Sequence, residues 1–248
     1  MQKARIVSGW FKQTLGHVRD FVNNILYWGT ERYCPICEKS SRKFRDYGIV
    51  PRKDAQCIHC GALERHRLIW LFFTRKSNLF DNKPKKVLHV APEKFFVKRL
   101  KDYIGSGYIT ADLSDPQAML KMDITDIQYP DEFFDVIYCS HVIEHILDDR
   151  RALREFYRVL RSDGWAVLLV PITSDKTFED PLVIDPSERL SLFGQEDHVR
   201  RYGPDYIDRL RETGFRVQVI KPSDFLNYDE IVSMGITIAS GDIYFCRK

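Results

Sequence analysis

Residues 134–171 read FDVIYCSHVIEHILDDRRALREFYRVLRSDGWAVLLVP, and this stretch decides the fold class. It opens with an apolar run at 134–139 and closes with another at 165–170. Short apolar runs of this kind predict buried strands, whereas residues 143–161 repeat their apolar positions with helical spacing. A strand, a helix and a strand in succession predict two parallel strands joined by a covering helix.

The same alternation extends toward the N-terminus. Apolar runs at 87–90 and 108–111 predict two more strands, with a helix expected over 92–104 between them. These elements predict a parallel sheet that is covered on both faces. The end of the chain differs, because the strand candidates 215–220 and 242–246 have no helix pattern between them. We therefore expect a closing hairpin whose last strand runs antiparallel to the others.

The composition is that of a folded protein. The chain has 248 residues, of which 44% are hydrophobic and 29% charged. This length is ample for a hydrophobic core, and the apolar content argues against general disorder. The sequence has no apolar run of about 18 residues, so we expect no membrane-spanning helix. Its first 20 residues lack the pattern of a secretory signal, and we expect a cytoplasmic protein.

The charge is unevenly divided along the chain. Residues 1–86 hold 18 Lys and Arg against 7 Asp and Glu, whereas residues 87–248 hold 20 against 28. The basic part is suited to an anionic partner such as RNA, a phosphorylated substrate or a lipid surface. The alternative is that the basic part docks on the acidic body of the same chain. The sequence leaves both interpretations open.

Two pairs of cysteines predict a metal site. Cys34 and Cys37 form one C-x-x-C pair, and Cys57 and Cys60 form a second after a separation of 19 residues. This spacing is typical of a four-thiolate zinc ribbon, in which each pair turns two sulfurs toward one tetrahedral ion. Four thiolates leave no open position, so the zinc is expected to be structural. Iron in the same cage is the alternative that the sequence leaves open.

Three segments follow from these patterns. Residues 1–30 contain an amphipathic helix over 9–28, which packs on the protein or on a second subunit and makes a homo-oligomer one expectation. Residues 31–80 form the ribbon and a helix over about 62–76. The polar, proline-containing residues 81–86 are the expected linker. The α/β domain then covers residues 84–248.

Acidic residues follow the predicted strands at the expected ligand-binding edge. In an open parallel sheet, ligands bind outside the carboxyl ends of the strands, where the strand order reverses. Asp112 follows the second strand and is placed to accept from both hydroxyls of a ribose. Asp123, one segment later, can accept from an adenine amino group. The alternative for each is a helix cap or a loop acid.

The chain here resembles a known family. The order of VLHVAPE (87–93), YITADLS (108–114), KMDITD (121–126) and the stretch 134–171 resembles the class I S-adenosylmethionine-dependent methyltransferases, and most closely the broad "type 11" group. The resemblance covers about residues 84–248. It implies a Rossmann-like, seven-stranded, mostly parallel sheet whose last strand is antiparallel, here preceded by a small zinc-ribbon domain. It also implies S-adenosyl-L-methionine as cofactor.

The resemblance assigns cofactor-binding roles by position. Asp112 would bind the ribose, Asp123 the adenine amino group, and Ser140 and His141 would line the methionine end. The full expected set is His89, Ala91, Glu93, Asp112, Leu113, Asp123, Ile124, Ser140 and His141. The first loop departs from the family, because its glycine-rich D-x-G-x-G is replaced by residues 89–93, which contain no glycine.

A histidine-rich motif follows the strand 134–139. Helical spacing would let His141, Glu144 and His145 converge, and these three are the predicted catalytic residues. Two roles stay open: a divalent-metal site to which His198 adds a ligand, or an acid–base and acceptor-orienting role. The segment 174–202 is a predicted lid over the acceptor, or else an exposed loop. Its candidate acceptor residues are His198, Arg200, Arg201 and Tyr202.

These observations lead to two functional hypotheses. The first is an S-adenosylmethionine-dependent methyltransferase whose acceptor is a small molecule, a sugar or glycan, or RNA bound through residues 1–86, with the ribbon helping to present it. The second is a non-catalytic, nucleic-acid-binding ribbon on a degenerate methyltransferase scaffold. A nicotinamide-dependent dehydrogenase is disfavoured because the sequence has no G-x-G-x-x-G.

Overall fold

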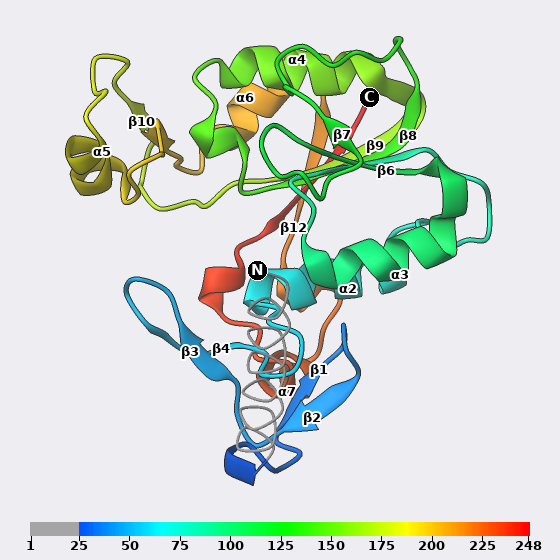
Figure 1. Cartoon of the computed structure of the whole chain (residues 1–248), viewed down its shortest axis with the longest axis vertical. Coiled ribbons are helices and arrows are strands. Elements are labelled where there is room, and N and C mark those ends of the chain that lie inside the picture. Colours follow the sequence, from blue (N-terminus) through cyan, green and yellow to red (C-terminus); the bar gives the residue numbers. More distant parts are fainter. Residues whose placement is uncertain (1–24) are drawn as a thin grey trace, which may run out of the picture. The chain divides into compact units, whose positions relative to one another are not determined.

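The computed structural model describes residues 25–248, which form two compact units (Figure 1). The first unit takes the chain up to Leu71 together with Leu226–Ser240. The second takes Phe72–Phe225 together with Gly241–Lys248. The helix predicted over 9–28, and an oligomer contact through it, fall almost entirely outside the described residues.

The unit boundaries differ from the predicted ones. The linker expected at 81–86 lies inside the second unit, and residues 226–240, expected in the α/β domain, belong to the first. The guanidinium of Arg67, which is completely buried, links the two stretches of the first unit. It donates to the backbone carbonyls of Met234 at 2.6 Å and Gly235 at 3.0 Å. Five N–H donors in a fixed fork make one buried arginine a strong backbone anchor.

The first unit is built from short elements. Its two-stranded sheets pair β1 with β2 and β3 with β4, and both pairs are antiparallel. The elements are β1 (Arg32–Cys34), β2 (Lys39–Ser41), β3 (Arg45–Tyr47), β4 (Arg52–Gln56), α2 (Glu64–Arg75), which continues into the second unit, α7 (Tyr228–Ser233) and the 3₁₀ turn Ile238–Ser240. The helix α7 lies between the last two long strands of the chain, where no helix was predicted.

The second unit contains the seven-stranded sheet, in the order β12-β13-β9-β8-β5-β6-β7. Only β13 is antiparallel to its neighbours, β12 and β9, which confirms the predicted fold class. The strands are β5 (Val87–Val90), β6 (Tyr108–Asp112), β7 (Leu120–Lys121), β8 (Phe134–Ser140), β9 (Leu160–Leu169), β12 (Arg216–Ile220) and β13 (Ile243–Arg247).

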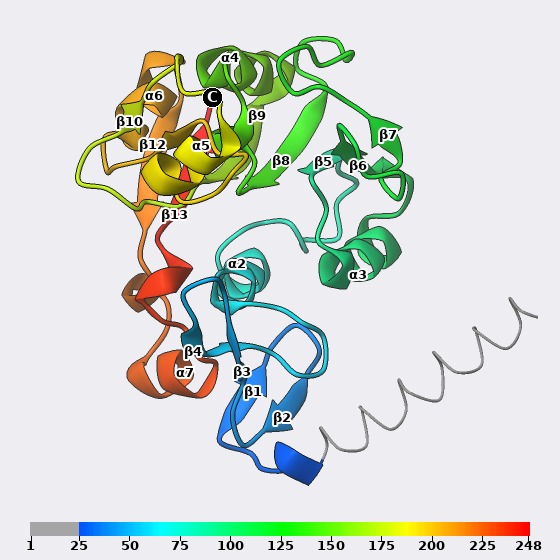
Figure 2. The ribbon, with the colours of Figure 1, turned by 60° about the vertical axis from the view of Figure 1, so that its left-hand side comes forward.

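Helices cover both faces of this sheet. The helices α4 (Asp149–Val159) and α6 (Tyr206–Glu212) lie on one face and α3 (Lys94–Ile104) on the other, as both ribbon views show (Figures 1 and 2). The segment between β9 and α6 holds β10 (Phe178–Glu179), α5 (Pro186–Phe193) and β11 (Arg200–Arg201). The predicted insertion is therefore structured, and β10 pairs with β11.

The helix predicted over 143–161 is shorter than expected. Its start is set by Asp148, whose carboxylate accepts from the amide of Arg151 at 2.9 Å and caps α4. Its end is set by Leu160, which is already extended and begins β9. Residues Ile143–His145 form a separate 3₁₀ turn. The histidine motif therefore does not stand on the first turn of an α-helix.

The core of the sheet is apolar and rich in aromatic rings. Phe72, Phe73, Trp165 and Phe245 pack edge-on or tilted, with ring centroids 5.5 to 6.3 Å apart. All four side chains are at most 7% exposed. Cys139 is completely buried, as predicted for a small apolar side chain. Among residues 25–248, no helix combines the length and the apolar character needed to cross a membrane.

Candidate active site at the carboxyl edge of the sheet

The strand order reverses at β5. From β5 the chain moves outward through β6 to β7, then returns to β8 on the other side of β5 and continues to β9. The carboxyl ends of β5, β6 and β8 therefore border the crevice in which open α/β sheets bind their ligands. This geometry brings together the loops that begin at Ala91, Leu113 and His141.

The loop after β5 does without glycine by an unusual backbone conformation. Ala91 has a φ of 48°, in the left-handed region that glycine usually occupies. Its amide donates to the carbonyl of Ala111 at 2.9 Å, which ties this loop to the end of β6. The loop thus has the backbone conformation that a glycine would favour, although Ala91 carries a methyl side chain.

His89 has a different role from the predicted one. Its ring is completely buried, with Nδ1 2.7 Å from the hydroxyl of Tyr108 and Nε2 2.7 Å from the carboxylate of Glu93. A second hydroxyl, from Tyr138, donates to the other oxygen of Glu93 at 3.0 Å. The His89 side chain cannot reach a ligand, because it holds Glu93 at the base of the loop. Sequence reasoning did not identify the two tyrosines.

Asp112 ends β6 at the crevice and shapes the following turn. Its Oδ1 accepts from the amides of Ser114 and Asp115, both at 2.7 Å. No hydrogen bond among the described residues ends on its Oδ2. The alternative role as a loop acid is thus present through Oδ1, whereas ribose binding through Oδ2 stays a prediction.

The other residues of this edge divide into exposed and buried ones. Asp123 is exposed, and its Oδ1 accepts from the amide and hydroxyl of Thr125 at 2.8 Å. Leu113 is also exposed. Ile124, predicted to line the cofactor site, is only 4% exposed and packs into the core. Its side chain is therefore removed from the candidate ligand contacts.

β8 ends in a strained turn that carries polar groups. The hydroxyl oxygen of Ser140 is buried and has no hydrogen-bond partner among the described residues. His141 follows with a φ of 55°, and its amide donates to the carbonyl of Leu169 at 2.9 Å. Non-glycine residues in the left-handed region are uncommon and gather at functional sites.

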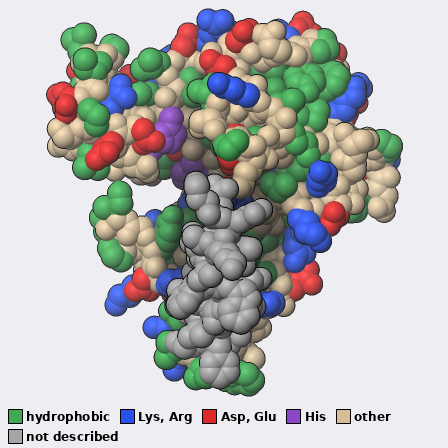
Figure 3. Space-filling model, viewed as in Figure 1, with side chains coloured by type: hydrophobic (Ala, Val, Ile, Leu, Met, Phe, Trp, Pro, Cys, Tyr) green, Lys and Arg blue, Asp and Glu red, His purple; other side chains and the backbone are tan. Residues whose placement is uncertain are grey.

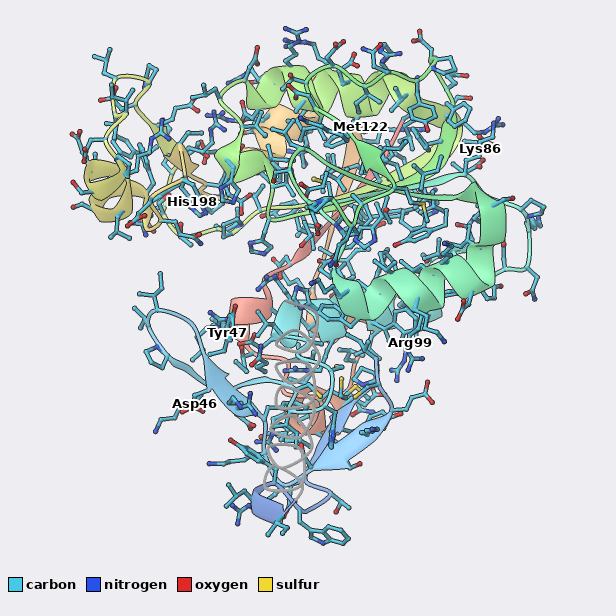
Figure 4. All side chains as sticks on the ribbon, in the orientation of Figure 1. Asp46, Tyr47, Lys86, Arg99, Met122 and His198 are labelled. Atoms are coloured by element: carbon cyan, nitrogen blue, oxygen red, sulfur yellow. The ribbon has the colours of Figure 1, made fainter. Side chains whose placement is uncertain are left out.

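Glu144, His145 and His198 converge beyond this turn. Their candidate ligand atoms all lie within 4.8 Å of one another. His141 is not part of this cluster, although its Nδ1 lies 3.4 Å from Oε1 of Glu144. Burial lowers the pKa of His198 below its ordinary value, which favours a neutral imidazole with a free lone pair. Figure 4 labels His198 beside the β10–β11 pair, and Figure 3 shows histidine side chains next to acidic ones at the surface.

The insertion holds its arginines in different environments. Arg200, predicted to bind an anionic acceptor, is 3% exposed and pairs with Glu179 at 2.7 Å. It also donates to the carbonyls of Ile143 at 3.1 Å and Leu147 at 2.8 Å. Arg200 is therefore committed to holding the insertion against the 3₁₀ turn and is not available to a substrate.

The two residues that follow Arg200 also differ from each other in exposure. Tyr202 is completely buried, and its hydroxyl donates to Asp149 at 2.6 Å, so it too is structural. Arg201 is partly exposed and bonds the carbonyl of Thr173. Of the predicted acceptor residues, the cluster histidine His198 and Arg201 remain candidates.

The four ribbon cysteines come together in the first unit. Sγ of Cys34 lies 3.7 Å from that of Cys60, and Sγ of Cys37 lies 3.7 Å from that of Cys57. All four are free thiols, with candidate ligand atoms within 4.8 Å of one another. Four sulfurs at about 2.3 Å from a tetrahedral ion would stand about 3.8 Å apart. The cage therefore has the dimensions of a tetrathiolate zinc site.

Comparison with known proteins relates part of the second unit to a known family. Residues 81–168 match the family model described as a methyltransferase domain. By this match, residues 81–168 form a methyltransferase domain. The matched stretch runs from before β5 to near the end of β9, so it contains Asp112 and Ser140 at the carboxyl edge.

Relatives of the methyltransferase domain are similar over part of their length. The uncharacterized methyltransferase YcgJ of Bacillus subtilis is 34% identical over 74 residues, 30% of this chain and 28% of YcgJ. Ajmaline N-methyltransferase of Rauvolfia serpentina is 35% identical over 79 residues, 32% of this chain and 24% of that protein. The chain thus spans about a quarter of the length of these curated relatives. The solved structure of YcgJ aligns with a TM-score of 0.47 and 19% identity, covering 70% of this chain and 79% of that one.

Proposed function

We propose that the protein is an S-adenosylmethionine-dependent methyltransferase whose cofactor lies at the carboxyl edge of β5, β6 and β8. The observation that carries this proposal is the buried, unpartnered hydroxyl of Ser140 at the reversal point of the sheet. Buried polar atoms without partners are rare in folded proteins, and at a ligand-binding edge a bound group would satisfy this hydroxyl. The free Oδ2 of Asp112 at the neighbouring strand end supports the same site.

The residues present fit this cofactor. Asp112 would accept from the ribose hydroxyls through Oδ2 while Oδ1 holds the turn, and exposed Asp123 would accept from the adenine amino group. Ser140 and His141 would line the methionine end, and Leu113 would contact the adenosine through its exposed side chain. When bound, the cofactor supplies an electrophilic methyl group.

The protein's own contribution to the reaction would be alignment and proton removal. Holding an acceptor atom in line with the methyl group turns a bimolecular step into an effectively unimolecular one. His141 is 30% exposed, so its imidazole can take a proton from a hydroxyl or amine acceptor. Glu144, whose Oε1 lies 3.4 Å from Nδ1 of His141, would position this ring.

The acceptor is proposed to be a small molecule or glycan. Of the two predicted acceptor arginines, Arg200 is buried and Arg201 is partly exposed, and a single exposed guanidinium suits one anionic group more than an extended phosphate backbone. RNA bound through the basic residues of the segment 1–86 is the second candidate, favoured by the charge excess in that segment.

We also propose that the four ribbon cysteines hold one structural zinc ion. The sulfur separations of 3.7 Å support this, and four thiolates close the coordination shell. Zinc in this place would fix the chain segment that presents the acceptor to the methyltransferase domain.

Calorimetric titration with S-adenosylhomocysteine tests the proposed function. We expect wild-type protein to bind the ligand, and Asp112→Asn to bind it roughly tenfold or more weakly, because hydrogen bonds to a charged group contribute about 1.5–3 kcal/mol each. Asp102→Asn, an exposed acid on α3, is the matched control and should bind as wild type. No binding at millimolar ligand would overturn the methyltransferase proposal and favour the non-catalytic scaffold.

A further inference from the structure

A second polar cluster beyond β8 is not explained by cofactor binding. Glu144 and His145 come from the 3₁₀ turn Ile143–His145, whereas His198 comes from the insertion, just before β11. The sequence separates the two segments by more than 50 residues, yet their ligand atoms lie within 4.8 Å of one another. Such convergence of one carboxylate and two imidazoles needs a physical reason.

Glu144 supplies the strongest indication that something is bound there. The side chain is only 1% exposed, and its Oε2 is buried without a hydrogen-bond partner among the described residues. Its other oxygen lies 3.4 Å from Nδ1 of His141, which is a long contact. Leaving a buried carboxyl oxygen unpartnered costs its full desolvation penalty. A cation at Oε2 would remove this penalty.

The two imidazoles are presented as ligands. The rings of His145 and His198 are nearly perpendicular, at 84°, with centroids 4.7 Å apart, so they approach edge to face and do not stack. Nδ1 of His145 lies 3.2 Å from Oδ2 of Asp197, so a proton on Nδ1 would face this carboxylate and leave Nε2 as an electron-pair donor. A carboxylate behind a histidine is the usual support of a metal-binding imidazole.

The two segments are fastened together independently of any ion. The amide of Val199 donates to the carbonyl of Glu144 at 3.0 Å. The buried guanidinium of Arg200 donates to the carbonyl of Ile143 at 3.1 Å and is itself paired with Glu179. These hydrogen bonds hold the 3₁₀ turn and the insertion together. The ligand atoms of Glu144, His145 and His198 are therefore preorganised, so less conformational entropy is lost when an ion binds.

We propose that Glu144, His145 and His198 bind one divalent first-row transition-metal ion, with Asp197 orienting His145. Two imidazoles and a carboxylate suit zinc, iron or manganese, whereas magnesium and calcium prefer oxygen ligands alone. Three protein ligands leave at least one coordination position open for water or another small ligand. The site does not depend on methyl transfer, so its test is independent of the proposed function.

Zinc content after dialysis of the full chain against zinc is the primary measurement. We expect wild-type protein to retain one equivalent of zinc more than the double variant His145→Ala/His198→Ala. Any zinc bound by the ribbon cysteines is present in both proteins and cancels in this difference. Glu144→Gln and Asp197→Asn should each weaken zinc binding at this site by tenfold or more. Glu196→Gln, an exposed neighbour outside the cluster, should bind zinc as wild type does. Equal zinc content in the wild type and the double variant would overturn the proposal.

A second measurement needs no variant and so cannot fail through misfolding. Crystals of wild-type protein grown with zinc should give an anomalous difference peak at the zinc edge between Glu144, His145 and His198. Its absence would overturn the proposal, even where a peak among the four ribbon cysteines shows that zinc reached the protein.

Discussion

At the scale of single residues, Ala91 shows how the chain keeps a glycine-type loop without the glycine. Its φ of 48° carries a strain of about 1–2 kcal/mol for a residue with a Cβ atom. Ala91→Gly would relieve this strain, and the greater freedom of the unfolded glycine chain would take back about 0.4–1 kcal/mol. We therefore expect the free energy of unfolding to stay equal or rise by up to about 1.6 kcal/mol, as measured by urea denaturation.

Ala152→Gly is the control for this prediction, because Ala152 is buried in α4, where the backbone is helical. There the same change should lower the free energy of unfolding by about 1 kcal/mol. Equal destabilisation by both variants would show that Ala91 is not strained in the folded protein.

At the scale of elements, the β10–β11 pair depends on a carboxylate between two arginines. Burial alone would raise the pKa of Glu179, but hydrogen bonds from Arg209 and Arg200 lower it from 4.5 to about 2. A carboxylate with a lowered pKa stabilises the folded state fully above its unfolded pKa, and this stabilisation is lost as the pH falls from about 4.5 to 2. Glu179→Gln should therefore lower stability at pH 7 and flatten the pH dependence of urea unfolding in that window.

Glu188→Gln, on exposed α5, should leave this pH dependence unchanged. A wild-type slope retained in Glu179→Gln would show that other acids carry the acid sensitivity.

The same elements show what the sequence could and could not predict. The strands β5, β6 and β8 match their predicted runs to within one residue, because apolar runs bounded by polar residues are a local signal. The inward orientation of Arg200 depends on distant partners such as Asp149 and Glu179 and has no local signal. Strand alternation did offer one hint, since of two adjacent arginines only one can face inward.

At the scale of the whole molecule, the chain returns to its first unit after the methyltransferase domain is nearly complete. No pattern within residues 226–240 predicts this, because the decisive contacts are to their backbone carbonyls. Arg67 holds those carbonyls, and the sequence shows it only as one basic residue in a helix. The convergence of the four ribbon cysteines, in contrast, could be predicted, because the two C-x-x-C pairs are a pattern visible in the sequence itself.

The proposed zinc ion should therefore control the stability of the first unit alone. Its sheets have only two strands each. Two-stranded sheets are only marginally stable unless a further element, such as a bound metal ion, stabilises them. Cys57→Ser should lose one equivalent of zinc and the lower-temperature transition in calorimetry. The seven-stranded sheet should still unfold cooperatively, because lengthening the free connection between β12 and β13 costs little loop entropy.

Cys246→Ser, which removes a thiol outside the four ribbon cysteines, is the control and should keep both the zinc and the lower-temperature transition. Loss of both transitions in Cys57→Ser would mean that the two units fold as one.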